Sequence, residues 1–90
     1  MKTIIRTGQF KKEIGKCKKR KYDLEKLYAV IEMLAQNKQL PPRLRAHKLK
    51  GEFTGYLECH IQPDWLLIYK SDAETVYLAR TGTHADLFQL

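Results

Sequence analysis

Three histidines, His47, His60 and His84, are the residues of this chain best suited to proton transfer. An unperturbed imidazole has a pKa of about 6.5, so it can accept or donate a proton near neutral pH. Arg80, four residues before His84 in the stretch LARTGTHADLF, could direct a guanidinium at a phosphate. Metal-free RNA cleavage needs a base for the 2′-OH, an acid for the leaving 5′-oxygen and cations for the charge on phosphorus. These four residues are candidates for such roles.

Two other interpretations of the histidines are open. A metal site is one, but no pair of residues has a ligand spacing such as HxxxH or CxxC. Cys59 also alternates to the opposite face of the strand expected to carry His60. We therefore expect no metal and no other cofactor. Ordinary polar surface is the second interpretation, and spacing alone does not decide between surface and function.

Two aromatic side chains lie near these candidates in the sequence. Trp65 follows a Pro-Asp turn, and Phe88 lies close to the C-terminus. Either could stack on RNA bases, an interaction of ~1–3 kcal/mol per base. Either could instead belong to the core or an interface, and Phe88 could fix the segment that carries His84.

Positive charge is concentrated in the first half of the chain. Residues 1–50 hold fifteen Lys and Arg against four Asp and Glu, whereas residues 51–90 hold two against six, and the net charge is +7. Two basic clusters stand out, KCKKRK at 16–21 and RLRAHKLK at 43–50. Such clusters attract polyanions, although a single lysine run is more often a solvated helix surface. The second cluster supplies four candidate RNA contacts: Arg43, Arg45, Lys48 and Lys50.

Apolar periodicity predicts two helices in the first half of the chain. Phe10, Ile14 and Cys17 follow an i, i+4, i+7 pattern after Thr7, which is a suitable N-cap. A second stripe begins after Asp23 and ends before a proline pair that a helix cannot continue through. The short link between the two stripes implies an antiparallel helical hairpin.

Extended segments surround this hairpin. A β-branched run at 2–6 precedes the helices, and four further strands are expected at 46–50, 55–61, 65–70 and 74–81. The segment 65–70 is apolar on both faces, as expected for a central strand. A short helical turn is expected in the final HADLF.

The alternation within the expected strands predicts which residues share a face. Leu57, Cys59 and Ile61 should face the helices, which leaves the other face to Tyr56, Glu58 and His60. Two helices cover only one face of so small a sheet, so the second face should be open or meet a partner.

Arg80 does not fit this alternation simply. It has the parity of Val76 and Leu78, which should face the core. Its side chain must therefore leave the core through strand twist, or by lying beyond the last paired residue.

Together these elements predict an α+β fold of order β-α-α-β-β-β-β. A two-helix hairpin packs on one face of a small, twisted and mainly antiparallel sheet, and a short helical turn ends the chain. The length suits one domain, 1–90. No apolar run approaches the ~20 residues of a membrane span, and the N-terminus lacks an export signal. We therefore expect a cytoplasmic protein in which Cys17 and Cys59 are buried thiols.

Two stretches, HKLKGEFTGYLECHIQPDWLLIYK and LARTGTHADLF, are similar to the YafQ branch of the RelE/ParE toxin superfamily. The signatures HxLxG, GYxxxHxxPDWLLIYK and RTGTHxxLF all stand in this chain. The resemblance covers nearly the whole chain in element order and is specific across residues 47–88.

This resemblance implies a ribonuclease toxin of a type II toxin–antitoxin system, which cleaves mRNA on the ribosome without metal by attack of the 2′-OH. His84 would be the general acid and Arg80 would stabilise phosphate charge. His60 would act near the 2′-OH, with Asp64 as base or orienter and His47 assisting. The family's functional set also includes Phe88.

The resemblance further implies an acidic cognate antitoxin that neutralises the toxin and forms a DNA-binding complex with it. We expect the toxin alone to be a monomer. Two alternatives stay open, a non-catalytic basic module that binds RNA or the ribosome, and a toxin directed at gyrase. The superfamily also contains members that act on gyrase and members that use lysine and arginine in place of histidine, so the presence of all three histidines favours the ribonuclease.

Overall fold

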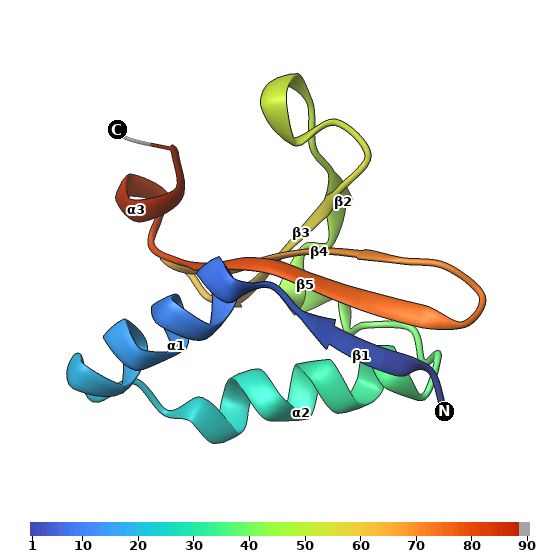
Figure 1. Ribbon diagram of the computed structural model, residues 1–90, viewed down its shortest axis with the longest axis horizontal. Coiled ribbons are helices and arrows are strands. Elements are labelled where there is room, and N and C mark those ends of the chain that lie inside the picture. Colours follow the sequence, from blue (N-terminus) through green and yellow to red (C-terminus); the bar gives the residue numbers. More distant parts are fainter. Residues whose placement is uncertain (89–90) are drawn as a thin grey trace.

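The computed structural model describes residues 1–88. It contains a five-stranded sheet with helices on both faces (Figure 1). The strand order is β1-β5-β4-β3-β2, in which β1 is parallel to β5 and the other neighbours are antiparallel. The predicted α+β class and element order are confirmed. The elements are β1 (Thr3–Arg6), α1 (Gly8–Lys19), α2 (Leu24–Ala35), η1 (Pro42–Leu44), β2 (His47–Lys48), η2 (Gly51–Phe53), β3 (Leu57–Gln62), β4 (Trp65–Ser71), β5 (Thr75–Gly82) and α3 (His84–Phe88).

The two long helices begin and end where the sequence predicted. The Thr7 hydroxyl accepts the N–H of Phe10 at 3.0 Å, and the Asp23 carboxylate accepts the N–H of Glu25 at 3.1 Å. Such N-caps satisfy helix donors that lack an intrahelical partner. Asn37 ends α2 in the left-handed region at φ 58°. Within residues 1–88, no helix has the length and apolar character to span a membrane.

Helices α1 and α2 cover one face of the sheet, below it in Figure 1. Phe10 and Cys17 of α1 and Leu27 of α2 are almost fully buried, at no more than 1% exposure. They pack in one cluster with the side chains of β3, β4 and β5 that point to this face. The predicted alternation is confirmed, since Cys59 and Ile61 belong to the cluster.

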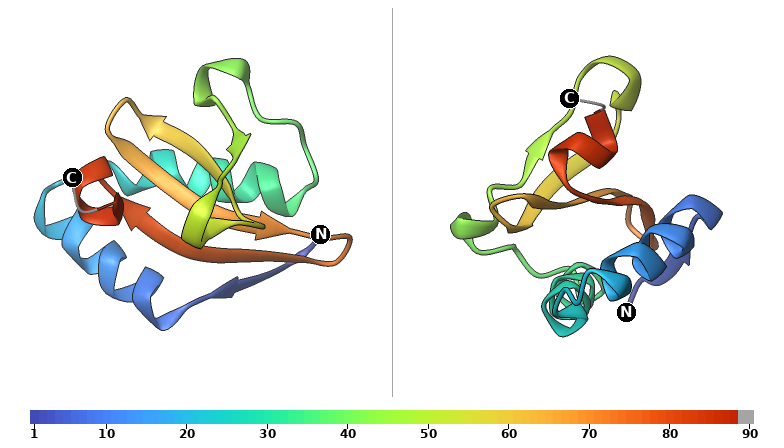
Figure 2. Two further views of the ribbon diagram at one scale, coloured as in Figure 1. Left: turned by 90° about the horizontal axis from the view of Figure 1, so that it is seen from above. Right: turned by 90° about the vertical axis from the view of Figure 1, so that its left-hand side faces the viewer.

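Strand β4 is buried on both faces and lies at the centre of the sheet. Leu67 and Tyr69 face the two long helices, whereas Leu66 and Ile68 form a second cluster with Leu87 of α3. The face that was expected to be open or to meet a partner is therefore partly covered by the chain itself. Figure 2 shows α3 and the β2–η2 segment on the side of the sheet opposite α2.

A β-bulge in β5 explains how Arg80 leaves the core. Ile68 pairs with Arg80, and the next residue of β4, Tyr69, pairs with Leu78. Ala79 is therefore an extra residue, and an extra residue reverses the alternation of side chains along a strand. Arg80 is still paired, so the predicted position beyond the last pair is wrong, whereas a bulge, which also increases the local twist of a strand, carries the side chain out of the core.

Trp65 is part of the core and is not free to stack on RNA. It is 1% exposed, and its indole Nε1–H donates to the Thr81 hydroxyl at 3.0 Å. That hydroxyl donates in turn to the carbonyl of Leu66 at 2.7 Å. Tyr22 packs on the indole with ring centroids 4.9 Å apart. The prediction that Trp65 binds RNA is therefore wrong, and its alternative as a core residue is confirmed.

Both cysteines are free and buried, as predicted. Burial raises the pKa of the Cys17 thiol above its ordinary value and that of Cys59 to about 12. Both side chains are therefore neutral, apolar parts of the helix-covered core.

Replacing the Thr81 hydroxyl should destabilise the fold. Thr81→Val keeps the shape of the side chain but leaves the buried indole N–H without its acceptor. An unsatisfied buried donor costs about 1–3 kcal/mol of unfolding free energy. Urea denaturation followed by circular dichroism measures this loss. Thr75→Val in the same strand is the control, and equal losses in the two variants would contradict the role of the hydroxyl.

Candidate active site

A row of side chains crosses four strands on the face opposite α1 and α2. The cross-strand partners His47, Glu58, Ile68 and Arg80 follow one another from β2 through β3 and β4 to β5. Residues directly opposite each other in antiparallel strands project to the same face. His60, two residues beyond Glu58 in β3, shares that face. The fold thus brings His47, Glu58 and His60 together on one surface, with Arg80 at the other end of the row.

Helix α3 brings His84 to this surface from the end of β5. The ring centroids of His84 and His60 are 5.8 Å apart, and those of His60 and His47 are 6.2 Å apart. The three histidines, distant in sequence, therefore form one cluster.

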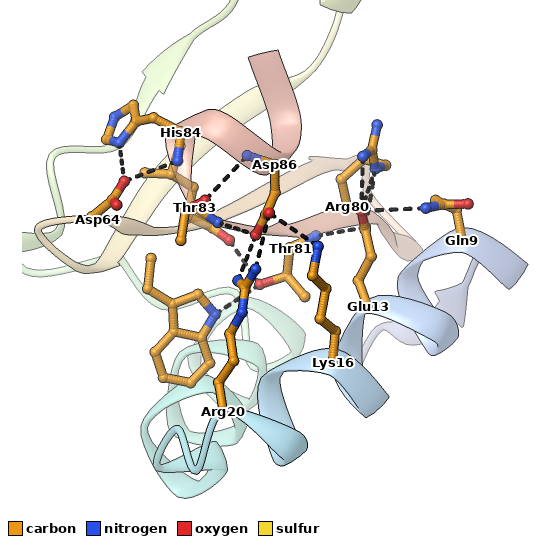
Figure 3. Close-up of polar contacts among 12 residues, drawn as sticks. Gln9, Glu13, Lys16, Arg20, Asp64, Arg80, Thr81, Thr83, His84 and Asp86 are labelled. Carbon is orange, nitrogen blue, oxygen red and sulfur yellow. Dashed lines mark hydrogen bonds and ion pairs between the residues drawn. The ribbon is translucent and has the colours of Figure 1, made fainter. Parts of the chain in front are cut away.

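Asp64 holds the imidazole of His84. The Nδ1 of His84 lies 2.6 Å from Oδ1 of Asp64, and the same oxygen accepts the backbone N–H of His84 at 2.9 Å (Figure 3). These contacts, led by the backbone hydrogen bond, lower the pKa of the Asp64 carboxyl below its ordinary value. An ionised carboxylate only accepts, so Nδ1 of His84 carries a hydrogen and Nε2 is left for a substrate.

This pairing changes the grouping expected from the sequence. Asp64 was expected to act with His60, but the turn after β3 brings its carboxylate to the first residue of α3. The acidic neighbour of His60 is Glu58, whose Oε1 lies 3.8 Å from Nε2 of His60.

Glu58 is a buried carboxyl group between two histidines, at 4% exposure. Its Oε1 lies 3.5 Å from Nε2 of His47, whose Nδ1 lies 2.9 Å from the carbonyl of Arg45. A carbonyl only accepts, so Nδ1 of His47 carries a hydrogen and Nε2 faces the carboxyl group. The Glu58 carboxyl group therefore has an imidazole nitrogen on each of two sides.

Glu58 was not predicted as a site residue. The sequence signal was present, because strand alternation put this acid on the same polar face as His60. Its burial was not visible from the sequence, since β2 and the neighbouring strands create it.

Three residues of the cluster could also hold a metal ion. Glu58, His60 and His84 each offer a ligand atom, and these atoms lie within 4.8 Å of one another. The Nδ1 of His60 is buried and has no hydrogen-bond partner among residues 1–88. Carboxylate and imidazole ligands suit several transition metals. The expectation that the protein uses no cofactor remains a prediction.

Arg80 lies apart from the histidines, against helix α1. Its Nε donates to Glu13 at 2.9 and 3.0 Å, and its Nη2 lies 2.7 Å from the same carboxylate. The hydrogen bonds that its guanidinium donates to Glu13 raise the pKa of Arg80. Figure 3 shows Arg80 on the far side of Asp86 from His84. A partly buried ion pair therefore fixes this guanidinium through Nε and Nη2, and its Nη1 group takes no part in the contacts with Glu13.

Glu13 was missed by the sequence reasoning. It is 7% exposed and also accepts the backbone N–H of Thr81 at 3.1 Å, so it satisfies a donor of β5. The available signal was its position among the buried residues of α1, between Phe10 and Cys17.

Phe88 joins the cluster from α3. Its ring lies 6.5 Å from that of His84 and packs edge-on against Phe53 at 5.8 Å. The side chain remains partly exposed. Phe88 therefore fixes the terminal helix and still presents surface beside His84.

The predicted basic contacts lie at the opposite border of the cluster. Arg43 and Arg45 line a groove of about 300 Å³ together with His60. Lys48 lies in β2 and Lys50 just before η2, and both are exposed. Their role in binding RNA stays a prediction.

Comparison with known proteins adds to this geometry. The chain is 40% identical over 83 residues to the mRNA interferase toxin YafQ of Escherichia coli K12, covering 91% of this chain and 90% of that protein. The toxin in the crystal structure of the E. coli DinJ–YafQ toxin–antitoxin complex is 39% identical, with a TM-score of 0.90 and 97% of each chain covered. A metal-bound toxin from Helicobacter pylori is 38% identical, with a TM-score of 0.90, covering 98% of this chain and 100% of that one.

The family model of YafQ, a bacterial toxin of type II toxin–antitoxin systems, matches residues 2–89. This match spans almost the whole chain, including every element that carries the histidine cluster. The chain therefore belongs to the YafQ family of type II toxin–antitoxin toxins.

Proposed function

We propose that this protein is an mRNA interferase, an endoribonuclease that cleaves mRNA on the ribosome by metal-free acid and base catalysis. The observation that carries the proposal is the Asp64–His84 pair, held at 2.6 Å beside His60 and Glu58. An imidazole fixed by a carboxylate, with its other nitrogen free, is a common device for proton transfer.

In this mechanism the 2′-oxygen attacks phosphorus while His60 accepts the 2′-OH proton. The bond from phosphorus to the 5′-oxygen breaks, and Nε2 of a protonated His84 donates a proton to that oxygen. The products are a 2′,3′-cyclic phosphate and a 5′-hydroxyl end. Oε1 of Glu58 lies 3.8 Å from Nε2 of His60 and 3.5 Å from Nε2 of His47, so Glu58 would pass the 2′-OH proton on from His60 to His47.

Substrate contacts surround this centre. Arg80 would offer its Nη1 group to the phosphate backbone, and Phe88 would meet a base next to His84. The four basic residues at the other border would bind further phosphates through charge, a contribution that weakens with salt. They are Arg43, Arg45, Lys48 and Lys50.

Two alternative functions receive less support. A non-catalytic RNA-binding module would not need an imidazole held by a carboxylate. A gyrase-directed toxin would not be expected to match relatives named as mRNA interferases. The Asp64–His84 pair and the names of these relatives favour RNA cleavage over both alternative functions.

A cognate antitoxin is the expected protein partner. The E. coli relative has been crystallised with the antitoxin DinJ. The charge of this chain, +7 overall, favours an acidic segment on such a partner. The site of action would be the cytoplasm, where mRNA is translated.

The first prediction concerns His84. His84→Ala should lower mRNA cleavage by ~10²–10⁴-fold, the usual contribution of a general acid or base. Purified variants are tested in a reconstituted translation reaction, with and without ribosomes, and new RNA ends are mapped. Attack by the 2′-OH predicts 5′-hydroxyl ends, whereas hydrolysis by a metal-activated water can leave 5′-phosphates.

Lys38→Ala is the matched control, because this exposed residue follows α2 and has no place in the cluster. A folded His84→Ala variant that retains more than about a tenth of the activity would refute the role of His84. If the wild type cleaves mRNA at the same rate with and without ribosomes, ribosome dependence is refuted, but the role of His84 is not.

The second prediction concerns pH. The pKa of Asp64 is lower in the folded protein than the value of about 3.9 in an unfolded chain. Its stabilising effect is therefore complete above that value and is lost as the pH falls toward the folded-state pKa. Asp64→Asn should flatten the loss of stability below about pH 4, measured by urea unfolding at several pH values.

The variant His84→Ala separates the two contacts that Asp64 makes. It keeps the backbone N–H, which is the larger cause of the lowered pKa, and removes the ring contact. Its acid dependence should therefore lie between those of the wild type and Asp64→Asn. Identical acid profiles for the wild type and Asp64→Asn would contradict the lowered pKa.

A further inference from the structure

The carboxylate of Asp86 ties α3 to the end of α1. It accepts from Nη1 and Nη2 of Arg20 at 2.6 and 3.1 Å, and from Nζ of Lys16 at 3.1 Å (Figure 3). The Asp86 side chain is only 15% exposed, and that of Arg20 is 32% exposed. The Arg20 guanidinium holds the pKa of the Asp86 carboxyl well below its ordinary value. The carboxylate is therefore charged throughout the physiological range.

The same carboxylate also closes the first turn of α3. Its Oδ2 accepts the N–H of Thr83 at 3.0 Å, while the Thr83 hydroxyl accepts the N–H of Asp86 at 3.1 Å. This reciprocal arrangement is a capping box, with aspartate in the place of the usual glutamate. Gly82 makes room for it, because a Cβ there would lie 2.9 Å from Oδ2 of Asp86.

Helix α3 needs such ties because it has only five residues, His84–Phe88. An isolated helix much shorter than about 12 residues is marginal in water. Its first residue is His84, and the Asp64 side chain that contacts His84 is itself 66% exposed. The position of the imidazole therefore depends on what holds the turn from Thr83 to Asp86.

Arg20 is a suitable fixed point for this purpose. Its guanidinium lies 5.9 Å from the ring centroid of Tyr22, which packs on the buried Trp65. The cation is thus held against the core by an aromatic face as well as by its partner carboxylate. A chain of contacts runs from the core through Arg20 and Asp86 to the turn that carries His84.

We propose that Arg20 and Asp86 are positioning residues that hold the His84 imidazole in place for proton transfer. Arg20 acts through Asp86 and the capped turn and makes no contact with His84 among the described residues. The inference rests on the proposed function, in which His84 transfers a proton during RNA cleavage. A misplacement of about 1 Å at a reacting group can lower a rate by ~10²-fold.

The test uses four variants: Arg20→Ala, Asp86→Asn, the double variant that combines these two substitutions, and the conservative Arg20→Lys. Lys19→Ala is the charge-matched control, since it removes one cation from the same helical turn and leaves the bonds to Asp86 intact. Cleavage of mRNA on ribosomes gives kcat and KM for each. We expect kcat to fall ~10–100-fold in Arg20→Ala, with KM close to that of Lys19→Ala. Arg20→Lys should recover part of the loss.

The double variant tests whether the two residues act through each other. If they do, the kcat of the double variant should equal that of the single variant with the lower kcat, because the effects of two residues in one network do not add. A product of the two single effects would show independent roles and overturn the proposal. An equal rise of KM in Arg20→Ala and Lys19→Ala with unchanged kcat would mark Arg20 as an RNA contact and also overturn it.

A measurement without RNA separates this proposal from the proposed function. NMR spectra report the His84 ring and the hydrogen exchange of the Leu87 N–H, which bonds to the carbonyl of Thr83 at 3.1 Å. Both should change in Arg20→Ala and stay unchanged in Lys19→Ala, with circular dichroism confirming that each variant is folded. Unchanged His84 and Leu87 signals would refute the positioning role even if the wild type cleaves RNA. If the wild type cleaves no RNA, the proposed function fails, while the NMR comparison still decides whether the tie holds His84.

Discussion

The burial of β4 on both faces is the constraint from which the surface that carries the histidine cluster follows. Helices α1 and α2 cover Trp65, Leu67 and Tyr69 on one face of β4, so Leu66 and Ile68 on the other face need a second apolar layer. Full burial of such a side chain contributes roughly 1.5–3 kcal/mol, which is large against the total stability of a small domain. Leu87 of α3 supplies that layer at 3% exposure. The last helix therefore packs on the second face because of its apolar side, and its first residue delivers His84 beside β3.

Polar ties then turn this apolar contact into a defined geometry. Apolar packing alone is not directional and tolerates small shifts. Carboxylates supply directional hydrogen bonds: Asp64 fixes the ring of His84, and Glu13 fixes the guanidinium of Arg80. Asp86 connects the same helix to α1. Each of these carboxylates bridges segments that lie far apart in the sequence, so the surface is assembled only when the whole chain is folded.

The distribution of charge has a different meaning in the structure from the one suggested by the sequence. The second half of the chain is acidic by count, yet Glu58, Asp64 and Asp86 are all paired with histidine or arginine. The basic residues of the first half, by contrast, are mostly exposed, and a polyanion would meet them first.

The sequence by itself determined the main helices and strands, their order and the three histidines of the cluster, because helical and strand periodicity are local and the signature motifs are contiguous. It also placed Glu58 and His60 on one face through alternation. The tertiary structure alone decided that Asp64 belongs to His84, that a bulge at Ala79 frees Arg80 from the core, and that Trp65 lies inside. It also decided that Glu13 binds Arg80, that Glu58 lies between two histidines and that Asp86 binds Arg20. These facts depend on which strand lies beside which helix, on register and on burial, and such long-range contacts leave no periodic trace in a single sequence.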